Sequence, residues 1–174
     1  MPAAHLDDPA GLDDLLLYRL ARLLSVGGSM VIRLCEGRFG ITRREWRVIA
    51  RLAHEDDLLS SELAERIQLD RARTSRAISS LVAKQLVRRE TGVADRRQAR
   101  LALTEQGRRL HRELFPLVAQ INQGLLSSLS PAQVDQLEHM LSALQERADA
   151  MVQDAAALPK ADRRRGARAR LPMG

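Results

Sequence analysis

The sequence predicts a mainly α-helical chain that carries one small β-hairpin, and three observations lead to this fold class. Apolar residues recur at spacings of three and four over long stretches, which is the period of a helix buried along one face. Aromatic residues number only four, so the core must be built from aliphatic side chains, which suit helices. Two short strand-like segments flank a polar loop after residue 86, and together they predict the hairpin.

The composition limits the class of protein. A chain of 174 residues is long enough for one well-buried core. It has no apolar run near the ~18 residues of a membrane span, and its acidic beginning does not resemble a signal peptide. We therefore expect no membrane association and a cytoplasmic location. The single cysteine, Cys35, excludes an internal disulfide and a multi-cysteine zinc site.

Catalytic chemistry finds no support in the sequence. The four histidines are scattered, and none has the spacing of a metal site or of a nucleophile–base pair. We therefore expect no enzyme, no catalytic residue, no metal and no cofactor. The histidines are His5, His54, His111 and His139.

The positive charge is concentrated in two segments. Residues 71–100 hold nine Lys and Arg against two acids, a local charge of +7, and residues 160–174 hold six against one, a local +5. Because the whole chain carries +6, the remainder sums to −6. Such an uneven distribution is typical of a protein that binds nucleic acid rather than of a uniformly solvated surface.

The N-terminal part is expected to be an arm followed by a long helix. Residues 1–12 contain Pro, Gly and acids and are predicted to be disordered. Residues 13–40 form the predicted helix, in which Gly27 and Gly28 each cost ~1 kcal/mol relative to Ala. A close helix crossing or the floor of a cavity would explain these glycines. The apolar stripe of this helix comprises Leu16, Leu20, Leu23, Met30, Val31 and Leu34.

Residues 41–104 are predicted to form one lobe. Thr42 and Glu45 have the spacing of a capping box and open a helix whose inner face includes Trp46. Trp46 is either a core residue or a flat wall that stacks on an aromatic ligand. A short helix from Ser60 to Ile67 follows and ends at a break.

The next helix has the pattern of a helix that enters the major groove of DNA. Asp70 is a good N-cap, and Thr74, Ile78, Leu81 and Val82 share an apolar stripe. A helix apolar on one side and rich in Arg, Ser and Thr on the other suits recognition of base edges. Its opposite face offers Arg71, Arg73, Ser75, Arg76 and Ser79.

The hairpin carries the most specific motif. Asp95-Arg96-Arg97 is followed by Leu101-Ala102-Leu103-Thr104-Glu105-Gln106-Gly107, and this resembles the wing of MarR-family winged helix-turn-helix regulators, D-x-R, three residues, then L-x-L-T-x-x-G. The segment Leu81–Val87 resembles the family's L-x-x-K-G-L-V, with Gln85 in place of Gly. That departure predicts a helix end without the left-handed residue that Gly favours. The resemblance extends from Leu15 to Val152.

The resemblance implies a winged helix-turn-helix that dimerises through its N- and C-terminal helices. The expected partners are a second copy of the chain and a pseudo-palindromic operator in double-stranded DNA. Arg97 at the wing tip is expected in the minor groove, with Asp95 orienting it and Arg96 beside it. The residues expected near base edges and phosphates of the major groove are Arg71, Arg73, Thr74, Ser75 and Arg76.

Residues 105–157 are predicted to form two further helices, capped by Thr104 and by Ser130. The second has apolar residues at spacings of three and four, a seam that needs a partner helix either within the chain or in a second copy. Residues 158–174 are predicted to be a disordered basic tail that either contacts phosphates or only keeps the protein soluble. The seam comprises Val134, Leu137, Leu141, Leu144, Ala148, Met151 and Ala155.

A ligand is also implied, because MarR relatives bind small, often aromatic, anions between their helices. We therefore expect a repressor that a small aromatic carboxylate releases from its operator. A polar stripe of the first helix supplies Arg22 as a candidate for the carboxylate, and His111 is a candidate donor. Residues 33–37 are similar to a subgroup that controls breakdown of aromatic or nicotinate-type acids. The predicted ligand residues are Arg22, Ser29, Trp46, His111 and Phe115.

Two alternative functions stay open at this point. Cys35, flanked by Arg33 and Arg38, could be a redox-sensing thiol of lowered pKa, although a lone cysteine in a packed helix is more often inert. The thiol-sensing branch of the family usually carries its cysteine nearer the start of this helix. The other alternative is a ligand-independent architectural or interaction protein with the same fold.

Overall fold

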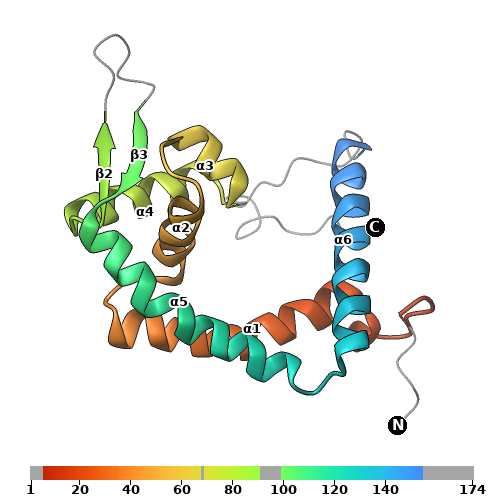
Figure 1. Ribbon diagram of the computed structural model, residues 1–174. Coiled ribbons are helices and arrows are strands. Elements are labelled where there is room, and N and C mark those ends of the chain that lie inside the picture. Colours follow the sequence, from red (N-terminus) through yellow and green to blue (C-terminus); the bar gives the residue numbers. More distant parts are fainter. Residues whose placement is uncertain (1–5, 68, 91–98, 155–174) are drawn as a thin grey trace, which may run out of the picture. The chain divides into compact units, whose positions relative to one another are not determined.

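The computed structural model describes residues 6–67, 69–90 and 99–154 (Figure 1). The chain divides into two compact units, one ending at Ser127 and one beginning at Ser128. The predicted fold class is confirmed, since helices predominate and a small sheet accompanies them. The elements are a 3₁₀ turn (Leu12–Asp14), α1 (Leu16–Arg38), α2 (Arg43–His54), β1 (Leu58–Leu59), α3 (Ser60–Arg66), α4 (Arg71–Ala83), β2 (Val87–Glu90), β3 (Arg100–Leu103), α5 (Glu105–Leu126) and, in the second unit, α6 (Pro131–Asp154).

The sheet is antiparallel, with strand order β1–β3–β2. The predicted hairpin pairs Val87 with Leu103 and Glu90 with Arg100. The sequence analysis did not anticipate β1, whose two residues are too few for a periodic signal and pair with the far edge of β3. Residues 91–98 of the wing lie outside the described residues, as do the first five residues and the basic tail.

The helix starts follow the predicted capping chemistry. The Thr42 hydroxyl accepts from the Glu45 N–H, and the Glu45 carboxylate accepts from the Thr42 N–H. Asp70 accepts from the Arg73 N–H at the start of α4, and Thr104 accepts from the Gly107 N–H at the start of α5. Each bond satisfies an N–H that the first turn of a helix leaves without an intrahelical partner.

The end of α4 corrects the sequence-based expectation. Gln85 adopts a φ of 57°, the left-handed conformation that was expected to be missing without glycine. Two hydrogen bonds impose it, from Leu86 N–H to the Leu81 carbonyl at 2.9 Å and from Gln85 N–H to the Val82 carbonyl at 3.0 Å. This is the Schellman pattern. Because Leu81 and Leu86 are both buried, the turn between them stays closed. Gln85 therefore adopts a positive φ although this conformation is strained for a residue with a side chain.

Gly27 lies where α1 meets α5. It is buried, and a Cβ there would approach a Leu125 methyl carbon at 3.3 Å. The close helix crossing is therefore the explanation that the structure supports for Gly27. The helix itself begins at Leu16 rather than at residue 13, because a 3₁₀ turn closed by the Asp14 carboxylate precedes it.

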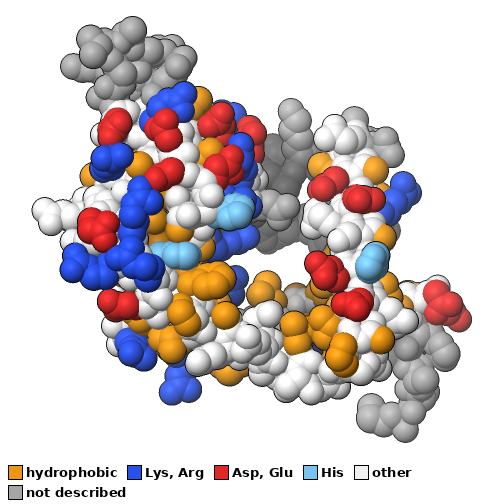
Figure 2. Space-filling model, viewed as in Figure 1, with side chains coloured by type: hydrophobic (Ala, Val, Ile, Leu, Met, Phe, Trp, Pro, Cys, Tyr) orange, Lys and Arg blue, Asp and Glu red, His pale blue; other side chains and the backbone are white. Residues whose placement is uncertain are grey.

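The core lies between α2, α3, α4 and the sheet. Fully buried side chains there include Ile49, Leu52, Leu63, Leu81 and Leu101. By contrast, many large apolar residues of α1 are exposed, and Figure 2 shows hydrophobic side chains gathered along the α1–α5 part of the first unit. The lobe that carries the sheet is covered instead by mixed positive and negative charge.

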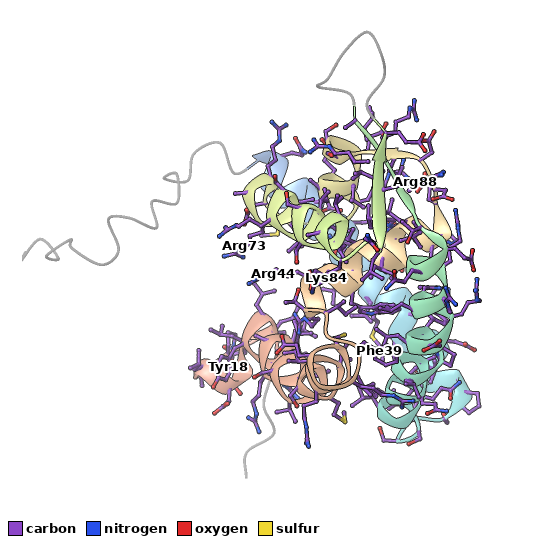
Figure 3. All side chains as sticks on the ribbon, turned by 90° about the vertical axis from the view of Figure 1, so that its left-hand side faces the viewer. Tyr18, Phe39, Arg44, Arg73, Lys84 and Arg88 are labelled. Atoms are coloured by element: carbon purple, nitrogen blue, oxygen red, sulfur yellow. The ribbon has the colours of Figure 1, made fainter. Side chains whose placement is uncertain are left out.

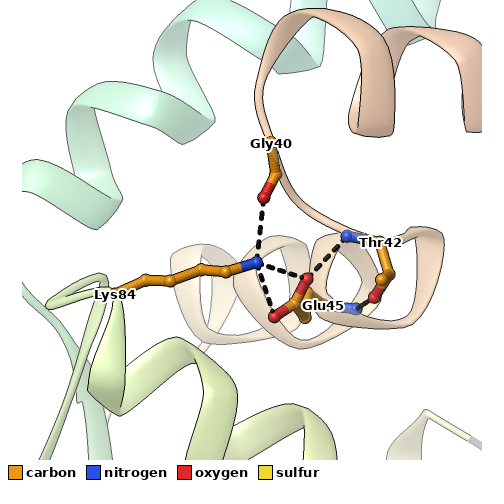
Figure 4. Close-up of polar contacts among 4 residues, drawn as sticks. All are labelled: Gly40, Thr42, Glu45 and Lys84. Carbon is orange, nitrogen blue, oxygen red and sulfur yellow. Dashed lines mark hydrogen bonds and ion pairs between the residues drawn. The ribbon is translucent and has the colours of Figure 1, made fainter.

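An ion pair between a buried carboxylate and an exposed lysine joins α2 to the end of α4 (Figure 4). Glu45 is 2% exposed, and its carboxylate lies 3.0 Å from Lys84 Nζ. Lys84 Nζ also donates to the Gly40 carbonyl at 2.9 Å. Burial would raise the pKa of Glu45, but hydrogen bonds from Ser80, Thr42 and Lys84 outweigh it and hold that pKa below its usual range.

We expect Glu45→Gln to lower the free energy of unfolding at neutral pH by about 2 kcal/mol, because it removes a charged acceptor shared by several donors. The contribution of Glu45 is present above the unfolded-state pKa and is lost as pH falls through the lower folded-state pKa. The stability difference from the wild type should therefore shrink in acid. Urea unfolding at several pH values measures it, with the exposed Glu65→Gln as control. An equal and pH-independent loss in both variants would contradict this assignment.

Candidate nucleic-acid interface

The exposed side of α4 is polar and cationic, as the sequence predicted. Arg71, Ser75, Arg76 and Ser79 are exposed, and Arg73 is half-buried. The side toward the core holds the apolar residues at a spacing of three and four. Val82, predicted on that apolar stripe, is 37% exposed and lies on the side of the helix instead.

Thr74 does not belong to the exposed side. It is 2% exposed, and its hydroxyl donates to the Asp70 carbonyl at 3.1 Å. Its helical position places it with Ile78 and Leu81 toward the core. Thr74 therefore supports the first turn of α4 from inside; it also lines the hollow toward α3, and its predicted DNA contact stays a prediction.

Arg73 is held in place by the cap of its own helix. Its Nε lies 3.0 Å from the Asp70 carboxylate, which also accepts from the Arg73 N–H. Arg73 also lines the hollow that it shares with Thr42 and Arg44. Figure 3 shows Arg73 and Arg44 at the same edge of the molecule.

Two hollows border α4, one on each side. The hollow toward α3 and β2, of about 330 Å³, is lined by Ser60, Ser61, Ala64, Arg71, Thr74, Ser75, Ile78 and Arg89. The hollow toward α2, of about 410 Å³, is lined by Thr42, Arg44, Glu45, Arg73, Arg76, Ala77 and Ser80. Cationic side chains therefore lie on both sides of the helix, and not only on its outer face.

The wing is described only at its base. Arg88 pairs with Glu90 at 3.2 Å on β2, while Arg100 on β3 pairs with Asp57 at 3.1 Å. Arg89 is exposed on β2 and lines the hollow toward α3. The predicted tip residues Asp95, Arg96 and Arg97 lie outside the described residues, and their roles stay predictions.

The structure adds arginines of α2 that the sequence analysis missed. Arg43, Arg44 and Arg47 lie in its first two turns, and Arg44 lines the hollow beside α4. The sequence analysis used this segment only for its capping box. The signal was present in the spacing, because residues three and four apart share a helix face.

Three of the five predicted ligand residues form one stack. The Trp46 and His111 rings lie 5.5 Å apart between centroids at an interplanar angle of 19°, and the His111 and Phe115 rings lie 5.4 Å apart. Trp46 is 7% exposed, whereas Phe115 is 53% exposed, so the stack runs from the core to the surface. Burial lowers the pKa of His111 and favours its neutral imidazole.

The other two predicted ligand residues make their hydrogen bonds elsewhere. Arg22 is exposed and lies 3.4 Å from the Asp13 carboxylate, within the N-terminal part of the chain. The Ser29 hydroxyl donates to the Val26 carbonyl of its own helix at 2.6 Å. The structure therefore brings together the aromatic part of the predicted ligand set and leaves its polar part on the α1 surface.

Cys35 is an apolar core residue in this structure. Its side chain is fully buried, and burial together with the charge of Glu36 raises the pKa of the thiol to about 11. A thiol of raised pKa is almost wholly protonated at neutral pH and is a poor nucleophile. The geometry therefore favours the inert role over the redox-sensing one.

Two further observations concern metal binding and membrane insertion. Within residues 6–67, 69–90 and 99–154, no group of three or more His, Cys, Asp and Glu side chains could hold a metal ion. The helices in the described part of the chain include none long and apolar enough to cross a membrane.

Comparison with known proteins identifies the lobe. Residues 39–98 match the sequence model of the MarR family. A MarR transcriptional regulator from Methanosarcina mazei Go1 is 25% identical with a TM-score of 0.67, over 76% of this chain and 98% of that one. A MarR-family regulator from Silicibacter pomeroyi DSS is 22% identical with a TM-score of 0.69, over 82% and 95%. BpsR from Bordetella bronchiseptica is 22% identical with a TM-score of 0.70, over 79% and 98%.

Proposed function

We propose, from the premise that this chain is a MarR-family transcriptional regulator, that it represses transcription from a pseudo-palindromic DNA operator and is released by a small aromatic carboxylate. The observation that carries the DNA-binding part is the outer face of α4. That face has no large apolar side chains and exposes two arginines and two serines. Asp70 caps the start of the helix, and the opposite face of the helix is buried in the core.

Recognition of DNA follows from the chemistry of that face. Arg76 and Arg71 can donate two hydrogen bonds each to guanine edges or bind phosphates. Ser75 and Ser79 can donate or accept at other base edges. The predicted wing arginine, Arg97, would add a contact in the minor groove, where a narrow A·T-rich segment attracts Arg.

A second copy of the chain is the expected partner for the exposed apolar surface. A groove of about 810 Å³ between α1 and α5 is lined mainly by apolar residues, among them Met30, Leu117 and Ile121. In α6, Leu141 and Leu144 of the predicted seam are also exposed. Exposed apolar surface of this extent marks an interaction site. Two copies would place their α4 helices in successive major grooves, ~34 Å apart.

We expect the wild type to sediment as a dimer at micromolar concentration. Replacing both Leu141 and Leu144 by Asp should shift it toward monomer, because unpaired charges in an apolar seam are costly. The double variant Gln136→Asp, Ser142→Asp adds the same charge to the other side of α6 and should remain dimeric. A folded wild-type monomer in sedimentation velocity would rule out the dimer.

Operator binding can be tested without knowing the natural site. A duplex selected from a random-sequence pool by the wild-type protein serves as the probe. Arg71→Ala with Arg76→Ala should weaken binding at least tenfold, since one lost base contact costs about 1–3 kcal/mol. The exposed Arg109→Ala on α5 is the charge control. Affinity within twofold of wild type in the α4 variant would exclude α4 as the recognition helix.

The effector part of the proposal draws support from the ring stack and from one relative. In BpsR from Bordetella bronchiseptica, DNA binding is regulated by 6-hydroxynicotinic acid, an aromatic carboxylate in its anionic form. In this chain the partly exposed Phe115 and the neutral His111 offer a flat apolar surface with one hydrogen-bonding group. Arg22, the predicted partner of the carboxylate, pairs with Asp13 on the α1 surface and is not part of this stack.

Release requires the ligand to bind one spacing of the two α4 helices better than the other. A tenfold loss of operator affinity needs about 1.4 kcal/mol of that difference. The trait that separates this proposal from a ligand-independent architectural protein is therefore a ligand-dependent loss of DNA binding. Thermal-shift screening of aromatic acids finds candidates, because a ligand at 100 times its dissociation constant adds about 2.7 kcal/mol of stability.

Arg22→Ala should abolish the response to the best aromatic acid and leave ligand-free operator binding nearly unchanged. His111→Ala should weaken the response less, because a neutral imidazole donates one hydrogen bond where Arg can donate two. Calorimetric titration of both variants measures this, with Arg19→Ala as the exposed control on α1. Wild-type affinity in both variants would place the carboxylate site elsewhere.

A further inference from the structure

A second cationic groove adjoins α4 on its α2 side. It has a volume of about 670 Å³ and lies between α1, α2 and α4. It shares Thr42, Arg44 and Arg73 with the hollow beside α4, so the two form one continuous strip. Its lining includes the α2 arginines Arg43, Arg44 and Arg47.

The positive charge of this groove is not balanced by its acids. Two acids lie near it. Glu45 is buried and pairs with Lys84, and Glu36 on α1 offsets the charge of only one of the three α2 arginines. Among the described residues, none of the three α2 arginines takes part in an ion pair. Partial burial and the neighbouring charge of Arg43 both lower the pKa of Arg47, as expected for cations held together without an anion.

Arg43 packs against α1. A Cβ at Gly28 would lie 2.8 Å from an Arg43 guanidinium nitrogen, so the missing side chain makes room for that group against α1. Arg43 thereby fills the inner side of the groove. Arg44 and Arg47 are exposed at its outer side and are free to meet a partner.

The position of the groove beside α4 indicates which anion it meets. The major groove is about 12 Å wide, and a helix with its side chains is about 10–12 Å across. A helix that enters it therefore has a phosphate backbone close to each of its sides. On one side of α4 these phosphates would meet α3 and β2, and on the other they would meet α2.

We infer that Arg44 and Arg47 bind the phosphates of the DNA strand that passes the α2 side of α4. This inference rests on the proposed function and adds to it a set of phosphate-binding residues outside the recognition helix and the wing. A strip of exposed arginines along the edge of α4 suits an extended polyanion, because successive phosphates can bind successive guanidinium groups. Arg73, which reaches the same strip from α4, joins the two surfaces.

The test compares three proteins on the duplex selected by the wild type. Arg44→Gln with Arg47→Gln should reduce the magnitude of the slope of log affinity against log salt by about 3.6, which is about 0.9 for each of four contacts in a dimer. The control Arg19→Gln with Arg109→Gln removes the same charge from exposed positions of α1 and α5. Its slope should change far less.

Ethylation interference adds a positional measurement. In the wild type, ethylated phosphates on both sides of each half-site should block binding, and in the Arg44, Arg47 variant one set should cease to matter. Arg44→Lys with Arg47→Lys should recover most of the salt slope, since it keeps the charge. Thermal denaturation confirms that each variant is folded.

The possible outcomes separate the two proposals. If the wild type selects no duplex, the proposed function itself fails. If the wild type binds and the α4 variant is weakened, but the Arg44, Arg47 variant matches the control in slope and interference pattern, the further inference alone is overturned. It is also overturned if that variant keeps full DNA affinity and loses only the response to an aromatic acid, which would make the groove a site for small anions.

Discussion

The Glu45 carboxylate is the constraint on which the arrangement of the lobe depends. It closes the cap of α2, neutralises Lys84 at the end of α4, and through Lys84 reaches the turn that follows α1. A buried carboxylate is stable only when such partners surround it. This charged centre therefore links α4 to α2 and to the turn after α1, in addition to the apolar packing between these helices.

Much of the fold could be predicted from the sequence, because its signals are local. Capping at Thr42, Asp70 and Thr104 depends on residues three positions apart, and the structure confirms each of them. The turn at Gln85 was mispredicted since its conformation is set by the burial of flanking leucines, which is a tertiary effect. The strand β1 escaped detection for the same reason, as only its pairing with β3 defines it.

The candidate site was less predictable, because which side of a helix faces the core is decided by its neighbours. Thr74 was predicted both on the apolar stripe and among the DNA-binding residues, and the structure buries it on the stripe. The spacing of the α2 arginines places them on one helix face, but the sequence does not show that this face borders the groove beside α4. The Trp46–His111–Phe115 stack joins two helices more than fifty residues apart, and its three residues were grouped beforehand only by the family resemblance, because no local signal links them.

Gly107 has a consequence for how motion passes through the molecule. A Cβ at this position would collide with the Leu86 carbonyl, so the first turn of α5 lies directly against the start of β2. Hydrogen bonds from Thr104 to Gln85 and Leu86 close the same junction. The base of the wing is thus joined to the first turn of α5 by close backbone packing and two hydrogen bonds, so a tilt of α5 would be transmitted directly to β2 and β3.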